Sequence, residues 1–175
     1  MRFLLLFLLF APLPLSSVDI GQLHKNDSNG LPAAPYSVGS KVTVEGTVTA
    51  GVGTFSSLEF DIYIQDETGG INVFAPNIPR VFRQGDKIRL TGMIQSNRGL
   101  TQLINPTDMA PISFQNPMPE PILLTCQQVN DSFLEDYSEP HESRLVRLHN
   151  MTIVEGSNNS YVISDGENQC IMILE

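Results

Sequence analysis

Alternation of apolar and polar residues is the feature that most constrains the fold of this 175-residue chain. The alternation recurs in five short segments between residues 41 and 104, and no helical period appears among them. A period of two places successive side chains on opposite faces of a half-buried strand. We therefore expect strands at Lys41–Thr49, Phe60–Gln65, Ile71–Phe74, Asp86–Ile94 and Leu100–Ile104.

Glycines suggest how these strands are connected. Gly46, inside the first segment, predicts a bend that lets one strand serve two sheets of a barrel. Glu67–Gly70 predicts a four-residue hairpin loop, because paired glycines supply the positive φ that such turns need. Together these features favour an all-β fold, a five-stranded Greek-key OB-fold barrel over residues 36–113. An SH3-like barrel is the alternative, since periodicity alone does not fix topology.

The alternation also selects a core and a candidate binding surface. The expected core contains Val42, Val44, Val48, Ile62, Ile64, Ile71, Val73, Ile88 and Leu90. The outward side chains of the hairpin are then Tyr63, Gln65, Asn72 and Phe74, and the predicted loop would place Tyr63 opposite Phe74. OB-folds bind oligonucleotides and oligosaccharides on this face, where aromatic rings stack on bases. The alternative is an aromatic pair covered by a neighbouring segment or protein.

The first residues are typical of a targeting segment. Met1 and Arg2 precede an apolar run that ends at Phe10, and Pro12 and Pro14 follow. The run is shorter than the roughly 20 residues of a membrane span, so residues 1–17 predict a cleaved secretory signal peptide. We expect a secreted or periplasmic protein with no membrane anchor after cleavage, and a linker at residues 18–35.

The C-terminal part repeats the earlier pattern incompletely. Residues 114–141 are rich in proline, which predicts a linker with one short helix near Val129–Tyr137. Residues 142–175 supply three strands of an incomplete second OB-like unit. The aligned pairs are Val42–Val48 with Val146–Thr152, Tyr63–Asp66 with Val162–Asp165, and Ile71–Val73 with Cys170–Met172. We expect a fragment with further domains beyond the C-terminus; the alternative is a unit completed by a partner.

Neither catalysis nor a cofactor is indicated by the residue pattern. His24, His141 and His149 form no metal-ligand spacing with cysteines or carboxylates, and no phosphate-binding glycine loop or nucleophile elbow is present. We therefore predict that the chain is not an enzyme and needs no cofactor. Cys126 and Cys170 could form a disulfide in an exported protein. The alternative is that Cys170, among aliphatic residues, is a buried core thiol.

The net charge of −9 is distributed unevenly. Residues 36–113 carry six basic and seven acidic groups, whereas residues 114–175 carry two basic and ten acidic groups. The acidity of the whole chain argues against a strong non-specific nucleic-acid binder. From Arg80 to Arg98, however, five basic groups accompany one acidic group, and we expect Lys87, Arg89 and Arg98 to contact phosphates.

Four motifs carry a resemblance to a known family: Val44–Thr49, Tyr63–Ile71, Gly85–Gly92 and Asn97–Leu103. Between Val42 and Ile104 the chain resembles OB-fold domains of secreted bacterial proteins, which often precede nuclease or phosphoesterase modules. The resemblance implies an exported, non-catalytic module that binds single-stranded nucleic acid, or another polymer, as an accessory to a secreted nuclease. The alternative is a structural spacer, or a protein-interaction or oligosaccharide-binding domain, of an exported multidomain protein.

Overall fold

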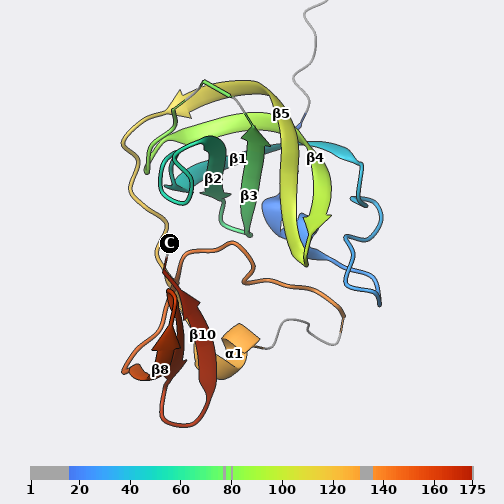
Figure 1. Ribbon diagram of the computed structural model, residues 1–175. Coiled ribbons are helices and arrows are strands. Elements are labelled where there is room, and N and C mark those ends of the chain that lie inside the picture. The colour runs from blue at the N-terminus through green and yellow to red at the C-terminus, as the bar shows by residue number, and fades with distance from the viewer. Residues whose placement is uncertain (1–15, 77, 80, 131–135, 175) are drawn as a thin grey trace, which may run out of the picture.

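A computed structural model describes residues 16–76, 78–79, 81–130 and 136–174, and its regular structure is mostly β-sheet (Figure 1). The predicted signal peptide, residues 1–17, lies almost entirely outside the described residues. Within the described part of the chain, no helix is both long enough and apolar enough to cross a membrane.

Five strands form a closed ring in the order β1-β2-β3-β5-β4. Their bounds are β1 (Lys41–Ala50), β2 (Glu59–Gln65), β3 (Gly70–Pro76), β4 (Lys87–Asn97) and β5 (Leu100–Ser113). As predicted, β1 serves two neighbours, and Thr47 is paired with both β2 and β4. The register shift lies between Val48 and Ala50, however, rather than at Gly46, where the bend was predicted. β3 and β5 run parallel, and the other neighbours in the ring run antiparallel.

The ring encloses the core that the alternation predicts. Val42 is 5% exposed, and the other eight predicted core residues have no exposed surface: Val44, Val48, Ile62, Ile64, Ile71, Val73, Ile88 and Leu90. Phe82, from the β3–β4 connection, packs edge-to-face against Phe60, with ring centroids 6.2 Å apart. Burial of these apolar side chains is the main favourable contribution to folding of the ring.

The fifth strand is longer than predicted. It continues past Ile104 to Ser113 and pairs with β4 along most of that length, although it contains Pro106 and Pro111. Three register shifts interrupt this pairing, and Asn105 and Asp108 have φ values of 50° and 52°. Bulges of this kind accommodate prolines, because a bulged residue leaves the hydrogen-bond ladder that proline cannot join. The predicted end at residue 104 was therefore wrong.

The segment predicted as the first linker contributes to the core. Ile20–His24 forms the 3₁₀ helix η1, and Ile20 and Leu23 are fully buried in the core of the ring. Side chains three residues apart lie on one face of a 3₁₀ helix, so both reach the core. Just before η1, the Val18 backbone N–H donates to the Thr43 carbonyl oxygen at 2.8 Å. The linker prediction is wrong for residues 18–24, which close one end of the ring.

Residues 122–130 and 146–174, which we call the second unit, form a smaller β-structure below the ring in Figure 1. Its elements are β6 (Ile122–Leu123), α1 (Cys126–Asn130), β7 (Val146–Arg147), β8 (Thr152–Ser157), β9 (Ser160–Ser164) and β10 (Gln169–Ile173). β8, β9 and β10 form a three-stranded sheet, and β6 pairs with β7. The predicted helix at 129–137 overlaps α1 only at residues 129 and 130, because α1 begins earlier, at Cys126. Residues 131–135 lie outside the described part of the chain.

The same kind of contact between a hairpin loop and a helix occurs within each unit. In the first unit, which we define as residues 18–113, Asp66 Oδ2 accepts a hydrogen bond from the Ile20 backbone N–H at 2.9 Å. In the second unit, Asp165 Oδ2 accepts one from the Cys126 backbone N–H, also at 2.9 Å. Helix α1 therefore corresponds to η1, and each helix begins at the loop of its hairpin.

A second shared contact joins the other end of each helix to the strand that follows the hairpin loop. His24 Nε2 lies 2.5 Å from the Gly70 carbonyl oxygen. At the corresponding position, the Asn130 side-chain amide donates to the Gln169 carbonyl oxygen at 2.6 Å. The repeat therefore begins before residue 142: part of the segment predicted as the proline-rich linker, residues 122–130, belongs to the second unit.

The register of the repeat differs from the predicted alignment by one residue in its first strand. Ile153 pairs with Ile163 in the second unit, as Val48 pairs with Ile64 in the first. Val48 thus corresponds to Ile153, rather than to Thr152. One extra residue between β7 and β8 accounts for the difference, and a register shift follows at the same place in both strands.

Candidate ligand-binding face

The β2–β3 hairpin has a different register from the predicted one. Its loop is residues 66–69, Gln65 pairs with Gly70, and Tyr63 therefore lies opposite Asn72 rather than Phe74. Asp66 determines this loop, because its Oδ1 atom accepts hydrogen bonds from the backbone N–H groups of residues 68 and 69 at 2.7 and 2.8 Å. The partner of each residue changes by two positions, so each side chain stays on its predicted face.

Two rows of side chains cross the outside of the ring, and we call these eight residues the outer face. The first row contains Tyr63, Asn72, Gln102 and Gln95, and the second contains Asp61, Phe74, Ile104 and Met93. Each row follows the strand order β2-β3-β5-β4. The predicted aromatic residues thus lie in adjacent rows, as diagonal neighbours, which is within reach of contact for aromatic side chains.

The first row is largely a row of amide side chains. Gln102 donates from Nε2 to Gln95 Oε1 at 3.1 Å, and Asn72 donates from Nδ2 to Asp61 Oδ1 at 2.6 Å. Asn72 and Gln102 are only 3% and 4% exposed, so their amide groups mainly fix the surface on which neighbouring side chains lie. Gln95 and Gln102 were not predicted, because their place in this row depends on the parallel pairing of β3 with β5.

The aromatic residues keep part of their surface exposed. Tyr63 and Phe74 are both half-buried. Phe55, from the β1–β2 loop, contacts Tyr63 edge-to-face with ring centroids 5.3 Å apart, and it is 44% exposed. Ile104 and Met93 continue the second row as half-buried apolar side chains. The outer face therefore offers an apolar surface with two aromatic rings, Tyr63 and Phe74, and a third ring, Phe55, lies beside it.

Gln65 is not part of this surface, contrary to the prediction. It is 3% exposed, and its Oε1 atom accepts a hydrogen bond from the Leu145 backbone N–H at 2.9 Å. Arg144 covers the adjacent loop, donating to the carbonyl oxygens of Thr68 and Glu67 at 3.3 and 3.4 Å. The segment that precedes β7 thus covers the loop end of the hairpin.

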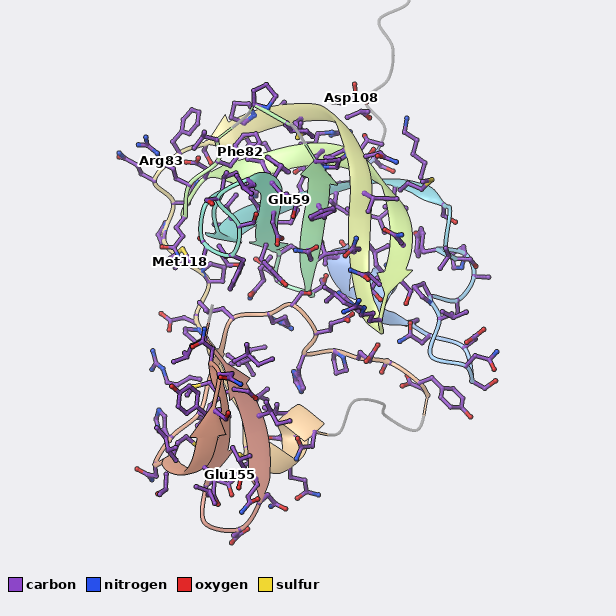
Figure 2. All side chains as sticks on the ribbon, in the orientation of Figure 1. Glu59, Phe82, Arg83, Asp108, Met118 and Glu155 are labelled. Atoms are coloured by element: carbon purple, nitrogen blue, oxygen red, sulfur yellow. The ribbon has the colours of Figure 1, made fainter. Side chains whose placement is uncertain are left out.

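The predicted basic residues do not gather beside the aromatic ones. Lys87 and Arg89 lie in the first half of β4, next to β1, and Arg89 Nη1 forms an ion pair with Glu45 Oε1 at 3.1 Å. Arg98 is exposed in the two-residue β4–β5 turn, past the end of β4 and outside both rows. Figure 2 places Arg83 on the side of the ring away from that turn. The expected basic stripe is therefore dispersed.

One basic residue that the sequence analysis did not select extends the outer face. Lys41, the first residue of β1, pairs with Met93 and is exposed. It follows Met93 in the second row, which Asp61 begins at the opposite end. The outward position of Lys41 follows from the burial of Val42, because adjacent strand residues face opposite sides.

Lys87 and Gln65 instead line a cleft of about 670 Å³ between β1, the β2–β3 loop and residues 117–120. Its charged lining residues are mainly acidic: Asp19, Glu45, Asp66, Glu67 and Glu120, against Lys87 and Arg144. A cleft with this lining repels phosphates. Among the described residues, no group of three or more His, Cys, Asp or Glu side chains is placed to hold a metal ion.

Comparison with known proteins gives one similar sequence and no matching family model. The chain is 32% identical over 112 residues to a protein named Endonuclease YhcR from Bacillus subtilis (strain 168). The aligned region covers 62% of this chain and 9% of that relative. This chain is therefore related to part of a much larger nuclease.

Proposed function

We propose that the five-stranded ring is an OB-fold that binds single-stranded nucleic acid on its outer face, as a non-catalytic, exported accessory of a nuclease. The strand order, the first strand shared between two neighbours and the hairpin of β2 and β3 support the OB-fold. The similarity to part of an endonuclease supports the accessory role. The apolar run at residues 1–17 supports export.

The observation that carries the proposal is the pair of half-buried aromatic residues, Tyr63 and Phe74, in adjacent rows of one face. Stacking on an aromatic ring is worth roughly 1–3 kcal/mol per base, and it is tolerant of base identity. The exposed cations Lys41 and Arg98 lie at the margins of the same face, where they can contact phosphates. We therefore expect recognition of bases by stacking, with a small contribution from charge.

Charge limits how strong this binding can be. With two phosphate contacts, the logarithm of the binding constant should fall with a slope of about −1.4 against the logarithm of salt concentration. Affinity then decreases only about sevenfold between roughly 50 and 200 mM salt. A strongly basic binder loses orders of magnitude over the same range, so the salt slope itself distinguishes stacking from electrostatic binding.

The proposal is tested by titrating the chain into a labelled single-stranded oligothymidine and following fluorescence anisotropy. Replacing Tyr63 and Phe74 together by alanine should weaken binding by about two orders of magnitude, because two stacking contacts are lost. The control is the double replacement of Val162 and Ile173, the corresponding positions in the second unit, and it should leave affinity unchanged. Equal binding by both double variants would contradict the proposal.

A structural spacer is the second candidate, and the covered hairpin favours it. The Leu145 N–H bonds to Gln65, and Arg144 bonds to the carbonyl oxygens of the hairpin loop, so the segment that precedes β7 occupies part of the ring's outer surface. Such contacts fix the second unit relative to the ring, as a spacer requires. Absence of oligonucleotide binding at millimolar concentration would leave this as the function of the chain.

A further inference from the structure

Two cysteines meet in the core of the second unit. Cys126 is the first residue of α1, Cys170 is the second residue of β10, and both are buried with Ile163 in one cluster. The Cys126 thiol lies 3.7 Å from the Ile163 carbonyl oxygen. Burial, followed by a hydrogen bond with Cys126 and the charge of that group, raises the pKa of Cys170 to about 12. Both thiols are free in the structure, and they lie in this one buried cluster, where α1 packs against β10.

The repeat shows what these cysteines replace. Cys126 corresponds to Ile20 and Cys170 to Ile71, and both isoleucines are fully buried in the core of the ring. The helix–strand contact that is aliphatic in the first unit is thus a pair of thiols in the second. Substitution of both partners of one contact distinguishes this site from a lone cysteine.

The second unit also has the smaller core of the two. Among the described residues, no strands correspond to β4 and β5, and Ile153 is 60% exposed where its counterpart Val48 is fully buried. Helix α1 has only five residues, too few to be stable without tertiary contacts.

We propose that Cys126 and Cys170 form a disulfide that fastens α1 to β10 and stabilises the second unit. With a small organic disulfide as oxidant, one cysteine thiolate attacks a sulfur of the reagent and expels one thiolate. The second cysteine then attacks the resulting mixed disulfide and expels the other. Two electrons pass from the cysteines to the reagent, and the two protons released by the cysteines are taken up by the two thiolates that leave.

The experiment equilibrates the purified chain with oxidised glutathione, alkylates the remaining thiols in denaturant and identifies peptides by mass spectrometry without reduction. The expected product is a cross-linked peptide pair containing Cys126 and Cys170. Reduction should then speed hydrogen exchange of the α1 and β10 amides by at least about 30-fold, while β1–β5 amides are unaffected. An effect confined to α1 and β10 distinguishes a disulfide that stabilises the second unit from a general effect of the reagent.

A matched variant removes the thiols without opening the core. Replacing both cysteines by isoleucine copies the first unit, and its exchange rates should not respond to reduction. If this variant does not fold, the double serine variant provides the same comparison. Recovery of both thiols fully alkylated, or carrying only glutathione, would overturn the proposal. An equal response of the variant to reduction would also overturn it. None of these outcomes depends on whether the ring binds nucleic acid.

Discussion

At the scale of single residues, His24 joins three separate parts of the chain. It is almost completely buried; Nδ1 lies 2.7 Å from Glu142 Oε2, and Nε2 contacts the Gly70 carbonyl oxygen. The other carboxylate oxygen of Glu142 accepts a hydrogen bond from the Thr101 backbone N–H at 3.0 Å. These contacts connect the N-terminal helix, the ring and the segment that precedes β7, so the role of this histidine is structural.

The ionised form of Glu139, which lies beside this group, is disfavoured in the folded chain. Burial, and secondarily the negative charge of Glu142, raises the pKa of Glu139 above its ordinary value of 4.5. The folded chain then binds the proton more tightly than the unfolded chain does. The resulting stabilisation is complete below the ordinary pKa, and it is lost as the pH rises through the raised pKa of the folded state.

We predict that Glu139→Gln abolishes the loss of stability at rising pH. The glutamine keeps the hydrogen bond that Asn26 donates to the side chain at 2.5 Å. Relative to the parent chain, the variant should gain stability between pH 4 and pH 7. Urea unfolding of both chains across this pH range measures the difference. A stability difference that is the same at both pH values would contradict the assigned pKa shift.

At the scale of elements, the aspartates at the two hairpin loops have matching roles. We predict that Asp66→Ala lowers the free energy of unfolding of the ring by about 2 kcal/mol, because charged hydrogen bonds to loop and helix amides are lost. Asp165→Ala is the matched change in the second unit, where the Cys126 N–H loses its acceptor.

Hydrogen exchange measured under reducing conditions checks this pair. Of these two helix amides, Asp66→Ala should speed the exchange of Ile20 only, and Asp165→Ala that of Cys126 only. If either replacement speeds both amides equally, the two helices are not held independently by their own hairpins.

The elements also show which features a sequence can indicate. The five strands and the core were predictable, because alternation over four or more residues determines which side chains are buried. The 3₁₀ helix at residues 20–24 was not, since five residues are too few to show a helical period. The end of β5 was also missed, because positive φ at Asn105 and Asp108 lets a strand continue past proline.

The candidate site likewise has some features that were predictable from the sequence and others that were not. Tyr63 and Phe74 were placed on the correct face by alternation alone. Their register depended on hydrogen bonds of one aspartate side chain in the loop, which composition does not specify. The amide row and Lys41 depended on strands far apart in sequence, and Gln65 was buried by a segment eighty residues further along the chain.

At the scale of the whole molecule, two related units differ in what their outer surfaces present. The first has Tyr63, Asn72 and Phe74 on its outer face, whereas the second has Val162, Ile171 and Ile173 at the corresponding positions. Ile171 and Ile173 are well exposed, so this second surface is apolar but lacks aromatic rings. Only the first unit should therefore bind bases by stacking, and the second serves as an internal control.

The most direct test of this account is an NMR titration of the ¹⁵N-labelled chain with single-stranded oligothymidine at low salt. We predict that the largest chemical-shift changes occur in β2, β3 and the facing part of β5, around Tyr63, Phe74 and Gln102, with little change in β8–β10. Shifts confined to the acidic cleft or to the second unit would contradict it, as would no shift at millimolar oligonucleotide.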